Sequence, residues 1–514
     1  MNSEKFAAAI ENSQFSILNS QLYQVPLHPI MTMIAIVLCY FAVLFAISRW
    51  TGRRATNQTF YRADRQSPWY MVAIGMVGAS ISGVTFVSVP GMVNSIGMTY
   101  LQTCFGFIVG YVVIAFVLLP LYYRLNLTTI YGYLGQRIGG RAYKTGASFF
   151  LLSKMTGAAV RFYVVCWMLM ECGLAPAVGK GAGSTIYNDL LFVAVVIIMM
   201  LLIWLYTRQG GIKTLVWTDV LQTICLFGAL LLIIYKVVGD LGLTMGDAAT
   251  TIYHSELSRV FVWDDWFSKQ YFWKQFLSGA FIAIVMTGLD QDMMQKNLTC
   301  RSLRDAQKDM CTYGVAFVPA NLLFLSLGVL LTLWYQQQSL ALPVKGDELL
   351  PAFIISSLPT ANGQMLNAVF ILGLVAAAFS SADSALTALT TSYCVDICGR
   401  PDDERLRRRV HIAMAAVFVI FILLFRVLNS TSVIDAIYIL CSYTYGPLLG
   451  LFAFGLLTKR KTNDSVVPYI CLASPVICYL LDMIVGQLTG YRFGYELLML
   501  NGLLTFFGLW VAKR

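Results

Sequence analysis

Polar and ionisable residues occur inside several long apolar segments of this sequence. Residues 78–83 are Gly-Ala-Ser-Ile-Ser-Gly, and residues 380–384 are Ser-Ser-Ala-Asp-Ser. Arg161 and Asp219 each stand within a further apolar segment. Hydroxyl, carbonyl and carboxylate oxygens are the ligands that replace the hydration shell of a hard cation such as Na⁺. These segments therefore predict binding of a monovalent cation, and Arg161 adds a group that could bind an anion.

The composition of the chain indicates where these residues lie. Of the 514 residues, 58% are hydrophobic and only 12% are charged, whereas a soluble domain carries about 25% charged residues. A lipid bilayer accommodates this much apolar surface, because each membrane-spanning helix needs about 20 mostly apolar residues. The net charge of +10 arises from Lys and Arg in short segments between apolar runs, so we expect no nucleic-acid partner.

Thirteen apolar segments are long enough to be candidate membrane-spanning helices. The segment that precedes the first has no basic region followed by a short apolar core, so we predict no signal peptide. The predicted spans are residues 30–47, 69–94, 101–122, 147–170, 190–206, 214–238, 272–294, 313–335, 365–395, 412–424, 437–457, 466–483 and 497–511.

The distribution of basic residues predicts the orientation of the chain. If residues 1–29 are extracellular, most of the 36 Lys and Arg residues, Lys296 included, fall in cytoplasmic segments. This asymmetry follows the positive-inside rule. We therefore expect a multi-pass protein of a bacterial inner membrane, embedded in the lipid bilayer, with its N-terminus outside and its C-terminus in the cytoplasm.

Ionisable residues within a span cost about 2.5–3.5 kcal/mol on insertion scales, so they commonly mark ion or substrate pathways. A structural role is the alternative, in which Asp219 and Asp383 pair with Arg161 or Lys154. Asp290 lies near the cytoplasmic end of its predicted span, where a gate or a solvated helix end is expected rather than a binding role.

Catalytic chemistry has little support in the sequence. Two of the three histidines, His28 and His254, fall in predicted outer segments, and His411 falls at an inner boundary. The twelve cysteines form no CxxC pair or Cys/His cluster with metal-ligand spacing, so we predict neither disulfides nor a zinc site. We expect no enzyme, although a membrane-embedded enzyme and a channel remain less favoured alternatives.

Four separated motifs resemble the sodium:solute symporter family, with the closest hints to its sialic acid and sugar transporters. They are residues 78–83 with Phe86 and Pro90-Gly91; Gly210-Gly211 with residues 217–220; residues 377–381 leading to Asp396; and residues 291–295.

This resemblance implies an all-α membrane fold of the LeuT-like type, with about thirteen transmembrane helices. Its core would cover residues 66–457 and contain two inverted five-helix repeats, at about 66–238 and 270–457. Residues 30–50 would form a peripheral first span, and residues 458–514 two peripheral C-terminal spans.

The resemblance also implies a sodium site made by the carbonyls of Gly78, Ile81 and Ala377 and the hydroxyls of Ser380 and Ser381. A further sodium would bind near Asp219, Ser380, Asp383 and Ser384. Asp383 departs from the family pattern, because a serine is expected there. Its carboxylate would either strengthen cation binding or titrate a proton.

The family's sialic acid branch implies the substrate residues. Ser80, Ser82 and Thr85 occupy hydroxyl positions that contact substrate, and Arg161 lies about one helical turn beyond the arginine that holds the substrate carboxylate. Cys104 stands where a substrate-facing glutamine is expected. A sugar, a sugar acid or another carboxylate remains compatible with these residues.

The predicted function is sodium-coupled import of a small polar solute by alternating access, with Na⁺ as the coupling ion. In this mechanism sodium binding straightens the second and ninth spans. A proton-coupled carrier of the same fold is the alternative, and the sequence leaves the oligomeric state open.

Overall fold

The computed structural model describes residues 27–53, 55–174, 185–428, 433–491 and 493–512. Within these residues the chain is almost entirely helical, and its only extended pairing is an isolated bridge between Ser67 and Cys300. Most of the predicted extracellular segment, residues 1–26, lies outside the described part of the chain.

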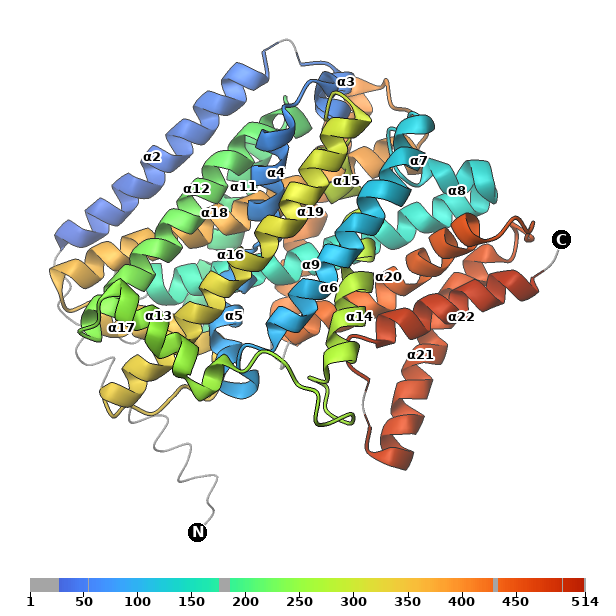
Figure 1. Cartoon of the computed structure of the whole chain (residues 1–514). Coiled ribbons are helices and arrows are strands. Elements are labelled where there is room, and N and C mark those ends of the chain that lie inside the picture. Colours follow the sequence, from blue (N-terminus) through green and yellow to red (C-terminus); the bar gives the residue numbers. More distant parts are fainter. Residues whose placement is uncertain (1–26, 54, 175–184, 429–432, 492, 513–514) are drawn as a thin grey trace.

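The α-helices can be followed along the chain in Figure 1. They are α2 (Leu27–Thr51), α3 (Asn57–Arg62), α4 (Trp69–Ser80), α5 (Gly83–Ile96), α6 (Tyr100–Val113), α7 (Leu119–Arg124), α8 (Gly132–Arg137), α9 (Gly140–Met168), α11 (Thr185–Thr207), α12 (Ile212–Asp240), α13 (Met245–His254), α14 (Phe272–Ala283), α15 (Gln291–Asn297), α16 (Leu303–Gln337), α17 (Leu349–Ser357), α18 (Ala361–Ser392), α19 (Glu404–Leu428), α20 (Val433–Leu457), α21 (Val467–Thr489) and α22 (Leu497–Val511).

The helices correspond closely to the predicted spans. In the described residues, nine helices are long and apolar enough to cross a membrane, and two bent helix pairs bring the number to as many as eleven. The first and last predicted spans correspond to shorter apolar helices, Ala35–Thr51 and Leu497–Val511. A multi-pass membrane protein is therefore confirmed, while the count of thirteen stays a prediction.

The second predicted span is broken in the middle. Helices α4 and α5 meet at an angle of 59°, and the backbone leaves the helical region at Ile81 (φ −84°, ψ 88°) and Ser82 (φ −78°, ψ 172°). The last carbonyls of α4 lose their intrahelical partners at such a break. Irregular backbone at membrane depth is tolerated only where protein or a cavity surrounds it.

A second break lies in the seventh span, whereas the predicted mechanism had sodium straighten the second and ninth spans. Helix α14 continues through the π-helical turn Ile284–Gly288 and then bends by 70° into α15. Asp290 starts α15 as its N-cap, because its side chain accepts hydrogen bonds from the backbone N–H groups of Asp292 and Met293. The ninth span is instead the continuous helix α18, so sodium binding has no break to straighten there.

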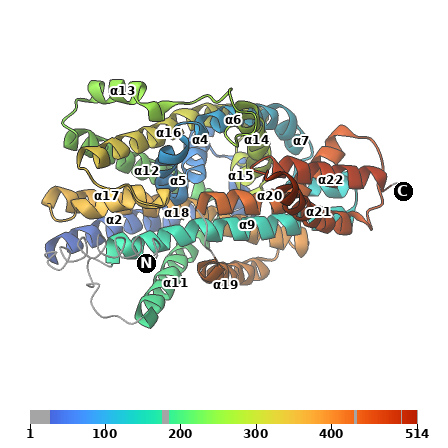
Figure 2. The same ribbon diagram turned by 90° about the horizontal axis from the view of Figure 1, so that it is seen from below.

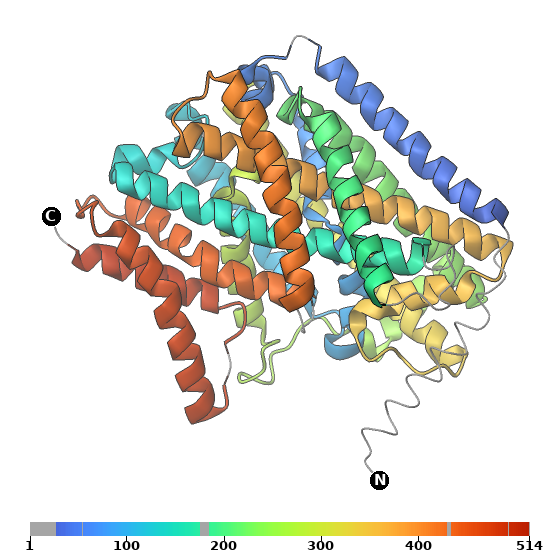
Figure 3. The same cartoon turned by 180° about the vertical axis from the view of Figure 1, so that it is seen from behind.

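The broken helices lie at the centre of the molecule. Helix α12 packs against α4 and α18, and the short helix α15 contacts α4, α12 and α18. Helix α9 packs against α18 and α20 beside them, as Figure 2 also shows. Figure 3 shows α2 along one edge and α21 projecting away from the bundle at the opposite side.

Candidate functional site

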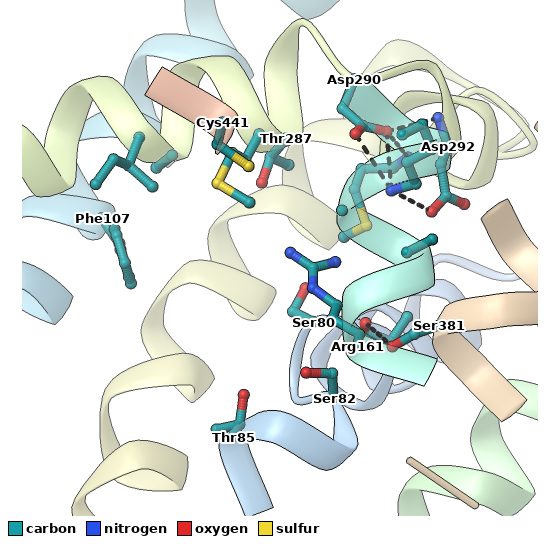
Figure 4. Close-up of a pocket in the computed structure, with 18 of the residues that line it drawn as sticks. Ser80, Ser82, Thr85, Phe107, Arg161, Thr287, Asp290, Asp292, Ser381 and Cys441 are labelled. Atoms are coloured by element: carbon teal, nitrogen blue, oxygen red, sulfur yellow. Dashed lines mark hydrogen bonds and ion pairs between the residues drawn. The ribbon is translucent and has the colours of Figure 1, made fainter. Parts of the chain in front are cut away.

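A cavity lies beside the break between α4 and α5 (Figure 4). Its walls come from α4 and α5, the two halves of the broken second span, and from α6, α9, α14, α15, α16, α18 and α20. The structure brings together in this wall all four residues predicted to contact a substrate, namely Ser80, Ser82, Thr85 and Arg161. Ser381, predicted as a sodium ligand, lines the same cavity.

Arg161 presents a positive charge to this cavity. It is half-buried on α9, and Figure 4 shows its side chain projecting toward the space beside Ser80 and Ser82. Among the described residues no carboxylate lies within ion-pairing distance of its guanidinium. The predicted structural pairing of Asp219 or Asp383 with Arg161 is therefore wrong. A guanidinium left free in a cavity wall can hold a carboxylate by two parallel hydrogen bonds.

Hydroxyl groups and aromatic rings form another part of the cavity wall. The Ser80 hydroxyl lies 2.6 Å from the Tyr313 hydroxyl, which in turn lies 2.9 Å from the Tyr111 hydroxyl. Phe107 and Phe317 contribute rings to the same wall. Such a combination of apolar surface and a few convergent polar groups is typical of a small-molecule site.

Cys104 does not line the cavity. Its side chain is fully buried, and Tyr100, Phe107 and Tyr111 of the same helix supply the cavity wall instead. The resemblance to the family therefore does not identify the residue of α6 that faces the cavity.

The predicted main sodium site lies where α18 crosses the break. The Ser381 hydroxyl donates a hydrogen bond to the Ala79 carbonyl over 3.2 Å, which joins α18 to the end of α4. Ile81, Ala377 and Ser381 are all buried there. Because the last carbonyls of α4 have no intrahelical partner, this position offers neutral oxygens for Na⁺.

Gly78 permits the close approach of α4 and α12 next to this site. A Cβ atom at Gly78 would lie only 1.9 Å from the Thr223 hydroxyl oxygen. That hydroxyl donates to the Asp219 carbonyl on its own helix and to the Ile74 carbonyl on α4. The glycine therefore helps to set the distance between the break and Asp219.

Asp219 is paired with Lys296, a residue that the distribution of basic residues had placed in a cytoplasmic segment. The Lys296 Nζ lies 2.7 Å from the Asp219 Oδ2, and both side chains are fully buried. The assignment of Lys296 to the cytoplasm is thus wrong, because the bend into α15 turns this lysine into the bundle. Ser380 donates to the other oxygen, Asp219 Oδ1, over 2.8 Å.

Asp383 lies near this pair and has a separate set of hydrogen bonds. The Tyr206 hydroxyl donates to its Oδ2, and the backbone N–H of Ser384 donates to its Oδ1 over 2.6 Å. Asp383 also interacts electrostatically with both Asp219 and Lys296. The four residues predicted to hold a further sodium are therefore close together, with a lysine among them.

A second buried ion-pair cluster lines the same cavity. Lys154 Nζ lies 3.2 Å from Asp290 Oδ2 and 2.7 Å from Asp292 Oδ2. The Tyr445 hydroxyl donates to Asp290 Oδ2 over 2.5 Å. Asp290 is only 2% exposed, so the predicted solvated helix end is wrong. Sequence reasoning missed this cluster, although Gly288 followed by Asp290 is the pattern of a helix stop and a new N-cap.

Asp396, which ends one of the resemblance motifs, has a structural role. Its carboxylate accepts hydrogen bonds from the hydroxyls of Thr129, Tyr143 and Ser392. These bonds tie the end of α18 to α9 and to the segment before α8.

Comparison with known proteins gives a consistent result. The model of the sodium:solute symporter family matches residues 60–466. The sodium/sialic acid symporter SiaT of Proteus mirabilis is 24% identical over 461 residues, which cover 84% of this chain and 86% of that protein. The sodium/sialic acid symporter NanT of Aliivibrio fischeri is 23% identical over 449 residues, covering 83% of each chain. The sodium-dependent multivitamin transporter of Oryctolagus cuniculus is 26% identical over 434 residues, covering 80% of this chain and 63% of that transporter.

Solved structures show the same fold. A Na⁺-coupled sialic acid symporter in a substrate-bound, outward-open state superposes with a TM-score of 0.78 at 19% identity, covering 93% of this chain and 97% of that one. A nucleobase-cation-symport-1 family transporter in a closed conformation gives a TM-score of 0.56 at 14% identity, covering 89% and 94%. The LeuT-like, all-helical fold class is thereby confirmed.

Proposed function

Because this chain belongs to the sodium:solute symporter family, we propose that the solute of its sodium-coupled symport is a small anionic molecule rich in hydroxyls, such as a sugar acid. The chain is a transporter and not an enzyme, and Na⁺ is its coupling ion. What the family leaves open is the solute, the residues that bind it and the direction of transport.

The observation that carries this proposal is the guanidinium of Arg161, which has no ionic partner among the described residues and faces a cavity lined by Ser80, Ser82 and Thr85. A carboxylate of the solute would pair with Arg161, and its hydroxyls would bond to the serine and threonine side chains. The two sialic acid symporters among the relatives transport a solute of this chemistry, which supports the same assignment here.

In this proposal Na⁺ binds at the break in the second span. Its ligands would be the carbonyls of Gly78, Ile81 and Ala377 and the hydroxyls of Ser380 and Ser381. Ser381 links this site to the solute, because it bonds to Ala79 at the break and also lines the cavity. Sodium at this position would fix the backbone that presents Ser80 and Ser82, so the two binding events would favour each other.

Alternating access would then open and close the two ends of the cavity. The ion-pair cluster of Lys154, Asp290 and Asp292 joins α9 to α15, and Tyr445 adds α20. We propose that this cluster is the gate at one end. The two broken spans would begin the two inverted repeats, at about residues 66–238 and 270–457, in a core of residues 66–457. Residues 30–50 and 458–514 would be peripheral.

We propose that the protein lies in a bacterial inner membrane, with its N-terminus outside and its C-terminus in the cytoplasm. The distribution of Lys and Arg supports this orientation, and it would make the Lys154 cluster the cytoplasmic gate. Uptake down the inward sodium gradient would follow from the same orientation.

The experiment that tests the sodium site compares thermal unfolding of the purified protein in NaCl and in choline chloride. We expect the unfolding midpoint to rise with NaCl concentration and then to saturate, because Na⁺ binds the folded state. Ser381→Ala should remove this shift. A wild-type protein that responds equally to both salts would contradict sodium binding at this site.

A further inference from the structure

We propose that Lys296 acts as a tethered cation that fills the place of a second sodium, so that this transporter binds and couples to a single Na⁺. This inference rests on the proposed function, since it takes the sodium site at the broken second span as given. It concerns the pocket between α12, α15 and α18, in which the resemblance implied a further sodium.

The geometry shows that the ligands of such a second sodium are already engaged. One oxygen of Asp219 is ion-paired with Lys296 Nζ at 2.7 Å, and the other accepts the Ser380 hydroxyl at 2.8 Å. Both oxygens of Asp383 accept hydrogen bonds as well. Among the four expected ligands, only the Ser384 hydroxyl has neither a hydrogen bond nor an ion pair in the described structure.

The position of Lys296 makes it a permanent part of this site. The side chain is only 1% exposed, and it extends from α15 into contact with α12. It also interacts electrostatically with Asp383 on α18. A buried ammonium that satisfies a buried carboxylate is held strongly, because removal of either partner leaves an uncompensated charge in a region of low dielectric constant.

The local charge balance also favours one sodium. With both carboxylates ionised, Asp219 and Asp383 together carry two negative charges, and Lys296 neutralises one of them. The proposed main site offers only neutral carbonyl and hydroxyl oxygens, yet it lies close to Asp383 along α18. A single Na⁺ bound there brings the group of Asp219, Asp383, Lys296 and the ion to zero net charge. A second Na⁺ would leave an unpaired positive charge in the interior.

Binding of radioactive sodium to the purified full-length protein tests this inference. We expect the wild-type protein to bind one Na⁺ per chain at saturation and Ser381→Ala to bind none. Lys296→Ala frees the Asp219 carboxylate, so it should bind two. In Lys296→Ala combined with Ser381→Ala one Na⁺ should remain, and a further Asp219→Asn substitution should remove it.

Two control variants separate charge from a general change in stability. Lys296→Arg keeps the positive charge and should bind one Na⁺. Lys213→Ala removes a partly exposed lysine that pairs with Asp64, and it should also bind one. Two Na⁺ in the wild-type protein, or one Na⁺ in a folded Lys296→Ala that Ser381→Ala abolishes, would overturn the inference.

If Lys296→Ala unfolds in choline chloride but folds in NaCl, the test is repeated in its combination with Ser381→Ala, which lacks the main sodium site. Recovery of that folded double variant in NaCl supports the inference, and failure to recover contradicts it. If Lys296→Ala unfolds in both salts, the wild-type protein alone provides the test. One Na⁺ bound per chain supports the inference, and two would overturn it. Failure of the proposed main site is recognised separately, because Ser381→Ala would then leave sodium binding unchanged.

Discussion

At the scale of single residues, the three basic side chains within the central helices have different surroundings. Lys154 and Lys296 are buried and paired with carboxylates, whereas Arg161 faces the cavity without an ionic partner in the described structure. A charge within the membrane is costly, so one left without a protein partner indicates a ligand that completes the pair. This contrast supports our proposal that Arg161 determines the specificity for an anionic solute.

Arg161→Ala should weaken binding of acidic solutes. A hydrogen bond to a charged group contributes about 1.5–3 kcal/mol, so we expect the apparent affinity for an acidic solute to fall by about 10- to 150-fold. Uptake of radiolabelled sugar acids into proteoliposomes measures this change, and Arg161→Lys should retain part of the affinity.

Stabilisation by NaCl should be the same in Arg161→Ala as in the wild-type protein, which separates loss of solute binding from misfolding. Unchanged uptake of every acidic solute would contradict the anionic part of the proposal.

At the scale of helices, two short breaks determine where polar groups can gather. The break at Ile81 and Ser82 frees backbone carbonyls beside α18, and the break before α15 turns Lys296 and Asp292 inward. Gly78 lies beside the first break, and the Asp290 side chain caps the helix that follows the second. Substitutions there are therefore expected to act on the arrangement of helices as well as on local contacts.

Gly78→Ala should destabilise the contact between α4 and α12. Its Cβ would lie 1.9 Å from the Thr223 Oγ1, so the helices must separate or a side chain must move. Overpacking of this kind costs about 1–3 kcal/mol, which should lower the midpoint of thermal unfolding. Gly228→Ala on α12 is the matched control, because its Cβ would meet no atom within 4 Å. Equal midpoints of thermal unfolding for Gly78→Ala and Gly228→Ala would show that α4 and α12 are not tightly packed at Gly78.

Asp290 stabilises the fold in two ways, as the N-cap of α15 and as an ion-pair partner of Lys154, and two substitutions can separate these contributions. Asp290→Asn keeps a good N-cap for α15 but removes the charge that pairs with Lys154, whereas Asp290→Ala removes both. Loss of an N-cap costs about 1 kcal/mol, so the alanine variant should unfold at the lower temperature. In either variant Lys154 keeps its ion pair with Asp292, at 2.7 Å in the wild-type protein, which limits the loss of stability. If both variants unfold at the same temperature, the cap contributes nothing measurable.

At the scale of the whole molecule, the number of sodium ions determines how the membrane potential acts on transport. Moving one charge across 100 mV contributes about 2.3 kcal/mol, which corresponds to about fifty-fold accumulation. Symport of one Na⁺ with a neutral solute would use this energy fully. Symport of one Na⁺ with a monoanion moves no net charge, so only the sodium gradient would drive it.

We therefore expect the transport of a monoanionic solute to be independent of voltage. Proteoliposomes with a fixed sodium gradient should accumulate it equally with and without an imposed inside-negative potential. Lys296→Ala, if it gains a second sodium, should become sensitive to that potential. Uptake by the wild-type protein that rises with voltage would contradict the combination of one sodium and a monoanionic solute.

Much of this protein was predictable from its sequence, because the bilayer imposes simple rules on composition. The apolar segments predicted the helices of a membrane protein, and the run of small and polar residues at 78–83 predicted the break that the structure contains. Ser80, Ser82, Thr85 and Arg161 were predicted to contact substrate, and the structure brings all four into one cavity wall. That Ser381 meets this break was also foreseeable from the motifs.

Only the tertiary structure decided which charged groups meet. The sequence placed Lys296 among cytoplasmic residues, and the fold turns it toward Asp219 because α15 bends by 70° from the preceding helix. The pattern of apolar residues cannot reveal such a bend, because a straight helix and a kinked helix of the same length show the same pattern. The pairings of Lys154 with Asp290 and of Lys296 with Asp219 join residues 136 and 77 positions apart, and packing between helices alone selects them.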